Sequence, residues 1–320
     1  MSNLHLDTIR EAYQKIRNFV RKTPLIHSTY LSELCGNKVY LKLENLQLTN
    51  AFKIRGALNS MLNLNTEEKT KGIVTASSGN HAQGIALAAR YLNIPAKIVI
   101  PKNISEAKLY KIMQYNVTVI QEGEFDEIEQ KARTLSTQEG LTYISPYNDL
   151  NIIEGQGTIA LEIYEDLKDV DVILVPIGGG GLISGIAFAS KALNSDIKVI
   201  GVQTKGASTM YNSWKTGKII EVEEFATIAE GLSGGLEPGA ITFDIIQNNV
   251  DQIVLVDEES VKKAIQLLWE LEGQIVEGAG AVVVAFLLEN PQKFRNKNIV
   301  AVISGGNITE SLLKKIITES

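Results

Sequence analysis

Segments typical of β-strands and α-helices alternate along almost the whole chain, and this alternation limits the possible folds more than any other feature. Residues 170–175 form a near-continuous apolar run, as expected of a central strand in a parallel sheet. Helical periodicity precedes this run at 153–167 and follows it at 182–193. The order predicts an α/β fold with open, mostly parallel, twisted sheets and helices on both faces.

The alternation continues past the size of one small sheet, so we predict two sheets. We expect strands at 39–43, 72–76, 96–100, 117–120, 141–144, 170–175, 197–202, 253–256 and 299–303. We expect helices at 9–20 (capped by Asp7 or Thr8 and ended by Thr23-Pro24), 52–62, 82–89, 126–138, 153–167 and 182–193, and others beginning at Ser105, Glu259 and Thr309. The predicted arrangement is a small domain, 51–144, inserted into a larger domain formed by 1–50 and 145–320.

Composition excludes several classes of function. The net charge of -6 and the pI near 5.3 argue against nucleic acid as a partner, because phosphate binding needs a basic face. The single cysteine, Cys35, excludes an internal disulfide framework and fits a reducing compartment. No signal peptide is expected, and the longest apolar run, 279–288, is about half the length of a membrane-spanning helix. We therefore expect a cytoplasmic soluble protein.

Lys53 is the first candidate for chemistry. It lies between Phe52 and Ile54 at the expected start of a helix. Apolar surroundings disfavour an ammonium ion, so they lower the pKa of a lysine and leave a nucleophilic amine of the kind that forms Schiff bases. The alternative is an ordinary lysine on a solvated helix face, so its assignment depends on partners elsewhere in the chain.

Four consecutive glycines, Gly178, Gly179, Gly180 and Gly181, follow the most apolar strand and open a helix. Such a loop lets backbone N–H groups approach an anion closely at a helix N-terminus. The dinucleotide pattern G-x-G-x-x-G fails in every register, and no lysine follows as in a P-loop. A single phosphate monoester therefore fits best; the alternative is a tight strand-to-helix turn.

Polar residues occupy two further strand ends. Ser77, Ser78, Gly79, Asn80 and His81 follow one strand and would suit a carboxylate or a polar ring substituent, although either serine could instead cap the helix. We interpret the His81 side chain as a hydrogen-bonded structural group. Ser304 follows the last strand. The segments 230–235 and 277–280 are glycine-rich with a carboxylate, and for each of these the alternative is a simple turn.

A reactive lysine, a phosphate loop and a serine at a strand end match a cofactor with an aldehyde, a phosphate and a pyridine nitrogen, which is pyridoxal 5'-phosphate. The segments 52–57, 78–83, 178–181 and 304–307 also resemble, in order, the motifs of the threonine dehydratase and serine racemase family. Members of this family share the tryptophan synthase β-subunit fold type, fold type II of the pyridoxal-phosphate enzymes.

The resemblance implies a role for each motif. Lys53 would hold the cofactor as a Schiff base and move the substrate Cα proton, with Phe52 beside the ring and Asn80 on the ring hydroxyl. Gly178 to Gly181 would hold the phosphate, and Ser304 would face the pyridine nitrogen. A neutral serine there would leave the ring unprotonated, which favours loss of a β-hydroxyl. The substrate carboxylate would be held by Ser77, Ser78, Gly79, Asn80 and His81.

The implied reaction is dehydration of L-threonine or L-serine to 2-oxobutanoate or pyruvate with release of ammonia. Ser78 matches the second base of the serine racemases, so amino-acid racemisation with dehydratase side activity is an alternative. The metal-binding acids of the racemases are replaced by Gln203 and Thr209, and no metal site is expected. Dehydration of another 3-hydroxy amino acid, and a non-catalytic amino-acid-binding protein on the same fold, are further alternatives.

The resemblance also bears on assembly and regulation. It suggests a homodimer or homotetramer. The chain ends soon after Asn307, so the regulatory C-terminal domain of isoleucine-sensitive dehydratases is not expected, and neither is inhibition by isoleucine.

Overall fold

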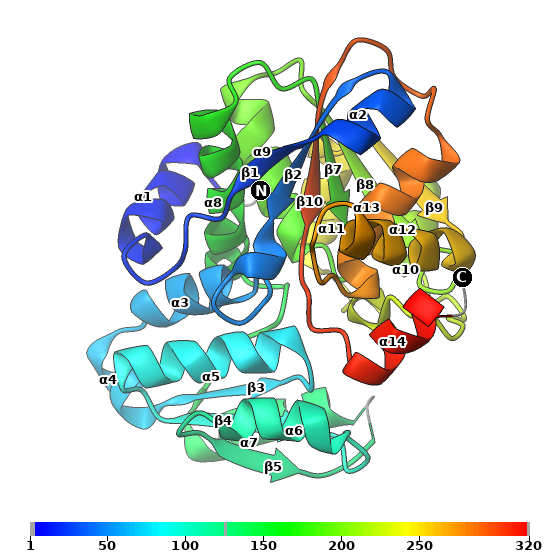
Figure 1. Ribbon diagram of the computed structural model, residues 1–320. Helices are drawn as coiled ribbons and strands as arrows, with labels where there is room; N and C mark the ends of the chain where they lie inside the picture. The colour runs from blue at the N-terminus through cyan, green and yellow to red at the C-terminus, as the bar shows by residue number, and fades with distance from the viewer. Residues whose placement is uncertain (1–3, 125–126, 319–320) are drawn as a thin grey trace.

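The structure, a computed structural model, describes residues 4–124 and 127–318. Two sheets lie in separate parts of the molecule, with strand orders β1-β2-β10-β7-β8-β9 and β5-β4-β3-β6 (Figure 1). We call the part around the first sheet the large lobe and the part around the second sheet the small lobe.

The sheet of the large lobe is parallel except at one edge. β7 lies between β10 and β8, so helices must cover it on both faces, and all five of its residues are buried. β1 is the exception, because it pairs antiparallel with β2. The strands are β1 (Leu25–Ser28), β2 (Lys38–Leu43), β7 (Val172–Pro176), β8 (Lys198–Thr204), β9 (Gln252–Val256) and β10 (Asn298–Ile303).

Helices cover both faces of this sheet and enclose two apolar cores. One core includes side chains from helices α1 (Leu6–Ile16), α8 (Leu150–Asp166), α9 (Gly181–Leu193), α10 (Thr209–Thr216) and α11 (Ile241–Asn249). The other includes side chains from α2 (Thr29–Cys35), α12 (Glu258–Glu270), α13 (Gly278–Glu289) and α14 (Glu310–Thr318). Two short 3-10 helices, η1 (Glu44–Leu46) and η2 (Glu230–Leu232), lie in its loops.

The sheet of the small lobe is parallel throughout its described strands, β3 (Ile73–Ala76), β4 (Ala96–Ile100), β5 (Thr118–Gln121) and β6 (Thr142–Tyr143). One core joins it to α3 (Ile54–Leu62), α5 (Asn80–Leu92) and α6 (Glu106–Met113), and a smaller core joins it to α7 (Ile128–Glu139). The short helix α4 (Thr66–Lys71) leads into β3. Figure 1 shows α3 between the two lobes.

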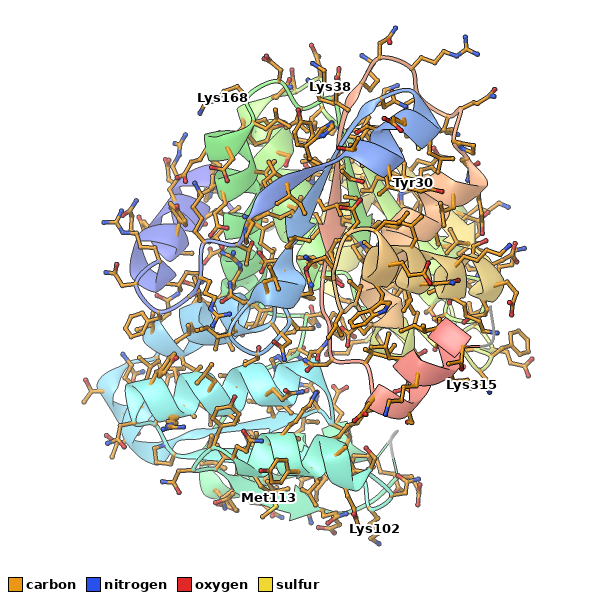
Figure 2. All side chains as sticks on the ribbon, in the orientation of Figure 1. Tyr30, Lys38, Lys102, Met113, Lys168 and Lys315 are labelled. Carbon is orange, nitrogen blue, oxygen red and sulfur yellow. The ribbon has the colours of Figure 1, made fainter. Side chains whose placement is uncertain are left out.

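The predicted fold class is confirmed: two mostly parallel sheets are covered by helices. The division into 1–50 with 145–320 and 51–144 stays a prediction. The surface carries outward-pointing charges such as Lys38, Lys102, Lys168 and Lys315 (Figure 2). Among the described residues, no helix combines the length and apolarity needed to cross a bilayer.

Several local predictions were wrong. The first helix ends at Ile16, and its N-cap position is His5, since Asp7 and Thr8 already lie within its first turn. Residues 278–280 form the first turn of α13, since burial against the sheet outweighs the low helix propensity of glycine. The predicted start of a helix at Asp126 lies outside the described residues. The alternation also failed to predict β1, α2, α4, α10 and α11.

Candidate active site

The segments singled out in the sequence meet between the two lobes. The amide of Phe52 donates to the carbonyl of Ser304 (3.1 Å), and Ala51 forms an isolated bridge with Gly305. Side chains of Asn80, from the small lobe, and Asn307, from the large lobe, are hydrogen-bonded. The lysine, the loop after β3 and the loop after β10 therefore share one site.

Lys53 stands immediately before α3, where it is the N-cap residue. Its Nζ donates to the carbonyl of Pro146 (2.8 Å) and lies 5.2 Å from the centroid of the Phe52 ring. Burial lowers the pKa of the Lys53 amine to about 8, and the negative charge of Glu277 opposes this shift. The amine is therefore much more often neutral at physiological pH than an ordinary lysine.

The glycine loop connects β7 to α9. Gly180 has a φ of 91°, and a Cβ there would lie 2.7 Å from Cδ1 of Ile246, so a larger residue would be both strained and crowded. Outside helices and strands, no backbone hydrogen bond between described residues uses the amides of Gly178, Gly179 or Gly180. These unpaired donors at the start of a thirteen-residue helix suit an anion.

Two other segments enclose the glycine loop. The ring of Tyr147, next to Pro146, packs so closely on Gly179 that a Cβ there would lie 2.5 Å from it. The Tyr147 hydroxyl accepts from the amide of Glu237 (2.9 Å). A Cβ at Gly178 would lie 3.2 Å from the carbonyl oxygen of Gly231, so the glycine-rich segment 230–235 borders the same site.

The loop after β3 leaves donors free at the start of α5. Gly79 is the N-cap residue and no side chain caps the helix, so the interpretation of Ser77 or Ser78 as the cap is wrong. The Ser77 hydroxyl instead accepts from the amide of Gly79 (3.3 Å), which closes a local turn. Since the first amides of a helix have no partner within it, this end of α5 can bind a carboxylate.

Asn80 is held in one orientation by two neighbours. Its Oδ1 accepts from Asn307 Nδ2 (2.7 Å), and its Nδ2 donates to Glu277 Oε1 (2.6 Å). Because the amide nitrogen carries two hydrogens, one N–H of Asn80 remains for a ligand. Lys111 donates to Asn307 Oδ1 (2.9 Å) and extends the chain of contacts to α6.

Glu277 is the site residue whose role sequence reasoning missed. It is the N-cap residue of α13, so the segment 277–280 is more than a turn. Burial raises the pKa of its carboxyl to about 7, although hydrogen bonds from Asn80 and from the backbone of Asn307 oppose the shift. The signal in the sequence was a carboxylate directly before a glycine-rich apolar run, but nothing there connects it to Asn80 or Lys53.

Ser304 and His81 occupy buried positions with different consequences. Ser304 is 3% exposed, and its hydroxyl has no hydrogen bond with another described residue, so it is available to a ligand. The His81 Nε2 lies 3.1 Å from Thr75 Oγ1, whose proton goes to the carbonyl of Ile144, so the imidazole donates to Thr75. Burial and the charge of Lys53 lower the pKa of His81 to about 3, and its side chain is a neutral structural group, as expected.

The positions compared with racemase metal ligands are engaged in other contacts. Gln203 donates to the carbonyl of Ile177 (3.1 Å) and accepts from the amide of Tyr211 (2.7 Å). Thr209 donates to Glu224 (2.7 Å). The absence of a metal site stays a prediction.

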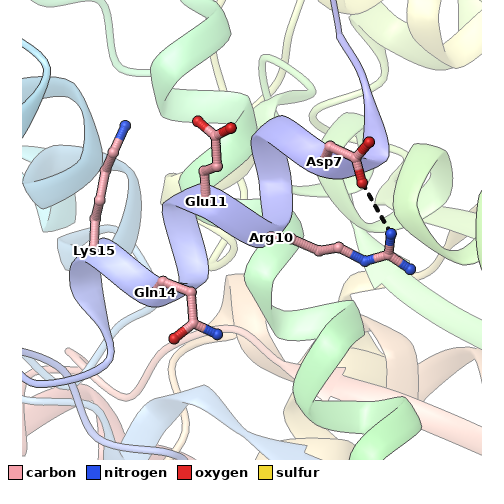
Figure 3. Close-up of a pocket in the computed structure, with 5 residues that line it drawn as sticks. All are labelled: Asp7, Arg10, Glu11, Gln14 and Lys15. Atoms are coloured by element: carbon pink, nitrogen blue, oxygen red, sulfur yellow. Dashed lines mark hydrogen bonds and ion pairs between the residues drawn. The ribbon is translucent and has the colours of Figure 1, made fainter.

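A hollow on the outer surface is unrelated to this site. Exposed residues of α1 alone line it, namely Asp7, Arg10, Glu11, Gln14 and Lys15 (Figure 3). Arg10 pairs locally with Asp7 (2.9 Å). Nothing in its lining matches the chemistry gathered around Lys53.

Comparison with known proteins agrees with this arrangement. The profile of the family described as pyridoxal-phosphate dependent enzyme matches residues 16–305. An L-threonine ammonia-lyase of Thermotoga maritima is 45% identical over 98% of this chain and 78% of its own length.

Solved structures give the same result for the fold. Threonine deaminase isoform 2 from Solanum lycopersicum superposes with a TM-score of 0.91 and 38% identity, covering 98% of this chain and 93% of its own. A serine racemase from maize superposes with a TM-score of 0.93 and 36% identity, covering 99% and 98%.

Proposed function

Because the chain belongs to the family of pyridoxal-phosphate dependent enzymes, we propose that it is an ammonia-lyase acting on L-threonine and L-serine. The products are 2-oxobutanoate or pyruvate, with ammonia. The similarity to the L-threonine ammonia-lyase supports this choice of reaction. The observation that carries it is the amine of Lys53, with a pKa of about 8, placed beside Phe52 and near Glu277.

The residues of the site fit pyridoxal 5'-phosphate. The amides of the 178–181 loop suit its phosphate, the remaining N–H of Asn80 suits its ring hydroxyl, and the Ser304 hydroxyl suits its pyridine nitrogen. The backbone amide of Phe52 donates a hydrogen bond to the Ser304 carbonyl, and this position suits a side chain at the edge of the pyridine ring. When bound, this cofactor supplies an electron-withdrawing ring that stabilises negative charge on the substrate Cα.

Lys53 has two tasks in this proposal. Its neutral amine binds the cofactor, and its Nζ later removes the proton from the substrate Cα. A pKa of about 8 suits both tasks, because neutral and protonated forms are both accessible near neutral pH. Ser304 offers a neutral hydroxyl and no carboxylate, so it places no negative charge beside the ring, and loss of the β-hydroxyl competes well with reprotonation.

The small lobe binds the substrate carboxylate in this proposal. Of the predicted residues 77–81, Ser78, Asn80 and His81 offer free backbone amides at the start of α5, whereas the amides of Ser77 and Gly79 donate to the Val99 carbonyl and the Ser77 hydroxyl. The Ser78 hydroxyl makes no hydrogen bond with another described residue. The imidazole of His81 is engaged with Thr75, so His81 contributes only its backbone.

A second candidate, amino-acid racemase, is favoured by the same free Ser78 hydroxyl, which could serve as a base on the opposite face of the substrate. The fold similarity to the maize serine racemase is consistent with it. A dehydratase acting on another 3-hydroxy amino acid is the third candidate.

The deciding experiment is chiral amino-acid and 2-oxo-acid analysis after incubation of the purified protein with L-serine and, separately, with L-threonine. We expect 2-oxo acid and ammonia without D-isomer, and loss of both activity and yellow colour in Lys53→Ala. D-serine that disappears in Ser78→Ala, while 2-oxo acid persists, would establish the racemase. Product from neither substrate would refute the first two candidates, and a colourless wild-type protein would indicate a binding protein.

We also propose that the protein works in the cytoplasm as a homodimer or homotetramer. The acidic pI and the single buried cysteine support the compartment. Sedimentation velocity tests the assembly, and a monomer at micromolar concentration would contradict it.

A further inference from the structure

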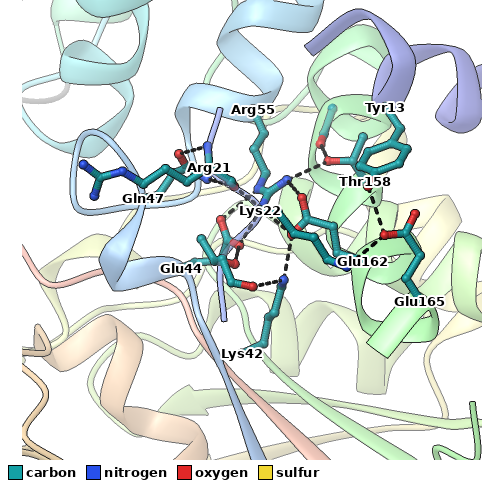
Figure 4. A network of polar contacts seen from close by, with 12 residues as sticks. Tyr13, Arg21, Lys22, Lys42, Glu44, Gln47, Arg55, Thr158, Glu162 and Glu165 are labelled. Atoms are coloured by element: carbon teal, nitrogen blue, oxygen red, sulfur yellow. Dashed lines mark hydrogen bonds and ion pairs between the residues drawn. The ribbon is translucent and has the colours of Figure 1, made fainter. Parts of the chain in front are cut away.

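Four charged side chains are buried together beside α3, outside the site described above. They are Lys42 of β2, Glu44 of η1, Arg55 of α3 and Glu162 of α8, and each side chain is at most 1% exposed. We call these four residues the buried charge cluster (Figure 4). Two cations and two carboxylates make its net charge zero.

Arg55 is the centre of the cluster. Its guanidinium binds Glu44 through Nε (2.9 Å) and Nη2 (2.8 Å), and binds Glu162 through Nη1 (2.7 Å) and Nη2 (2.8 Å). Nη1 also lies 3.3 Å from the hydroxyl of Thr158. Two bidentate pairs with carboxylates are a geometry that guanidinium can adopt and an ammonium cannot.

The rest of the cluster belongs to the large lobe and is itself fixed. Lys42 donates to Glu162 (2.6 Å) and to the carbonyl of Thr23 (2.7 Å), and the Thr23 hydroxyl donates to Glu44 (2.5 Å). Replacing a buried ion group by apolar residues is often neutral or stabilising, so stability alone does not explain such a cluster. What the cluster does provide is a fixed position for the one member that comes from α3.

Arg55, the member of the cluster that comes from α3, is two residues from Lys53 in the chain. Arg55 lies in the first turn of α3, and the backbones of α3 and α8 touch there, since a Cβ at Gly155 would lie 2.6 Å from the carbonyl oxygen of Arg55. On the other side of Lys53, Ala51 and Phe52 are joined to Gly305 and Ser304. The chain around Lys53 is thus attached to the large lobe both before and after the lysine.

We propose that Arg55 is a positioning residue for Lys53. By pairing with Glu44 and Glu162, Arg55 attaches the first turn of α3 to the large lobe and so fixes the position of Lys53. The amine therefore keeps its place relative to the 178–181 and 304–307 loops, while the loop after β3 belongs to the other lobe. This inference rests on the role proposed for Lys53. It also implies that the start of α3 moves with the large lobe, although the boundary predicted from the sequence included it in the small domain.

The test is Arg55→Lys in the holoenzyme, because lysine keeps the charge and loses the bidentate geometry. The control is Ile265→Val, which removes one buried methylene from α12, a helix that contributes no residue to the site. Both variants are compared with wild type by melting temperature, by kcat and KM for L-threonine, and by pH titration of the visible absorbance of the lysine-bound cofactor.

We expect Arg55→Lys to lower kcat about 10-fold or more with KM within about twofold, since small misplacements of a reacting group reduce rates by such factors. We also expect the pH midpoint of the visible cofactor absorbance in Arg55→Lys to differ from that of the wild type, whereas Ile265→Val should keep both kcat and this midpoint unchanged. If Arg55→Lys only melts earlier, with kcat and midpoint like the control, the proposal is wrong.

A milder variant covers the case in which Arg55→Lys fails to fold. Thr158→Val removes one contact of the Arg55 Nη1 and leaves both pairs between Arg55 and the carboxylates. It should therefore change kcat and the pH midpoint in the same direction as Arg55→Lys but by a smaller amount. Unchanged values in a folded Thr158→Val, with Arg55→Lys unfolded, would assign the cluster to folding and overturn the proposal. A wild-type protein without lysine-bound cofactor would instead refute the proposed function itself.

Discussion

The amine of Lys53 should be a much stronger nucleophile at neutral pH than an ordinary lysine. Its pKa falls from 10.5 to about 8 because protein surrounds the amine. At pH 7 about a tenth of an amine with pKa 8 is neutral, against about 0.03% of one with pKa 10.5. In the cofactor-free protein, acylation of Lys53 should therefore reach half its maximal rate near pH 8, well below the pH needed for an ordinary lysine.

The perturbation that tests the cause is Glu277→Gln. The charge of Glu277 raises the pKa of Lys53 and burial lowers it, so removing the charge should move the labelling midpoint of Lys53 below that of the wild type. The glutamine can still accept from Asn80, which limits structural change. A change in the opposite direction would mean that Glu277 does not act on Lys53 through its charge.

The assay is competitive labelling with a trace of reagent between pH 6 and 11, with the peptide that carries Lys53 quantified by mass spectrometry. The same peptide labelled in denaturant is the control, and its midpoint should return to the ordinary value near 10.4. A folded-state midpoint for Lys53 near 10 would refute the reasoning, because the surroundings of the amine would then not disfavour its charged form.

Three further predictions concern neighbouring groups. Gly180→Ala should lower the free energy of unfolding by about 2–5 kcal/mol, because the φ of 91° strains an alanine and its Cβ would lie 2.7 Å from Ile246. It should also weaken cofactor binding. Denaturant titration with and without cofactor checks both effects, and a stability equal to that of the wild type would contradict the prediction. The carboxyl of Glu277 has a raised pKa of about 7 in the folded protein, so its stabilising contribution is lost as pH rises from about 4.5 through 7. The cofactor-free Glu277→Gln variant should thus gain stability relative to wild type over that interval, by at most about 3 kcal/mol in chemical denaturation, and a difference independent of pH would refute it. Ser304→Ala should keep the visible absorbance of lysine-bound cofactor and lower kcat about two- to tenfold, which corresponds to the loss of one neutral hydrogen bond. An unchanged kcat would mean that the Ser304 hydroxyl has no part in the reaction.

The family and the cofactor, like the fold class, were predictable from the sequence because each rests on local patterns. Apolar runs such as 170–175 report burial on both faces of a strand, and glycines after a strand report the backbone conformation of the following turn. The roles assigned to 178–181 and Lys53 stay predictions, supported by the free amides of that loop and by the burial of the Lys53 amine.

Two wrong local predictions have different physical causes. The strand β1 is four residues long and only partly buried, so it lacks the apolar run that identified β7. The serines before α5 had the composition of a cap, but Gly79 takes that position and leaves no side-chain cap. For β1, pairing with β2 outweighed the weak local pattern. Before α5, the Ser77 hydroxyl instead accepts from the nearby amide of Gly79 and closes a local turn.

Contacts between distant parts of the chain were decided only by the tertiary structure. Glu277 meets Asn80 across 197 positions, and Glu162 meets Arg55 across 107. The periodicity of apolar residues shows which side of an element is buried but carries no information on which polar groups face each other there. The sequence therefore indicated a lysine and a glycine loop as candidates for chemistry, whereas the tertiary structure decided that the charge of Glu277 acts on the lysine and that Arg55 pairs with Glu44 and Glu162.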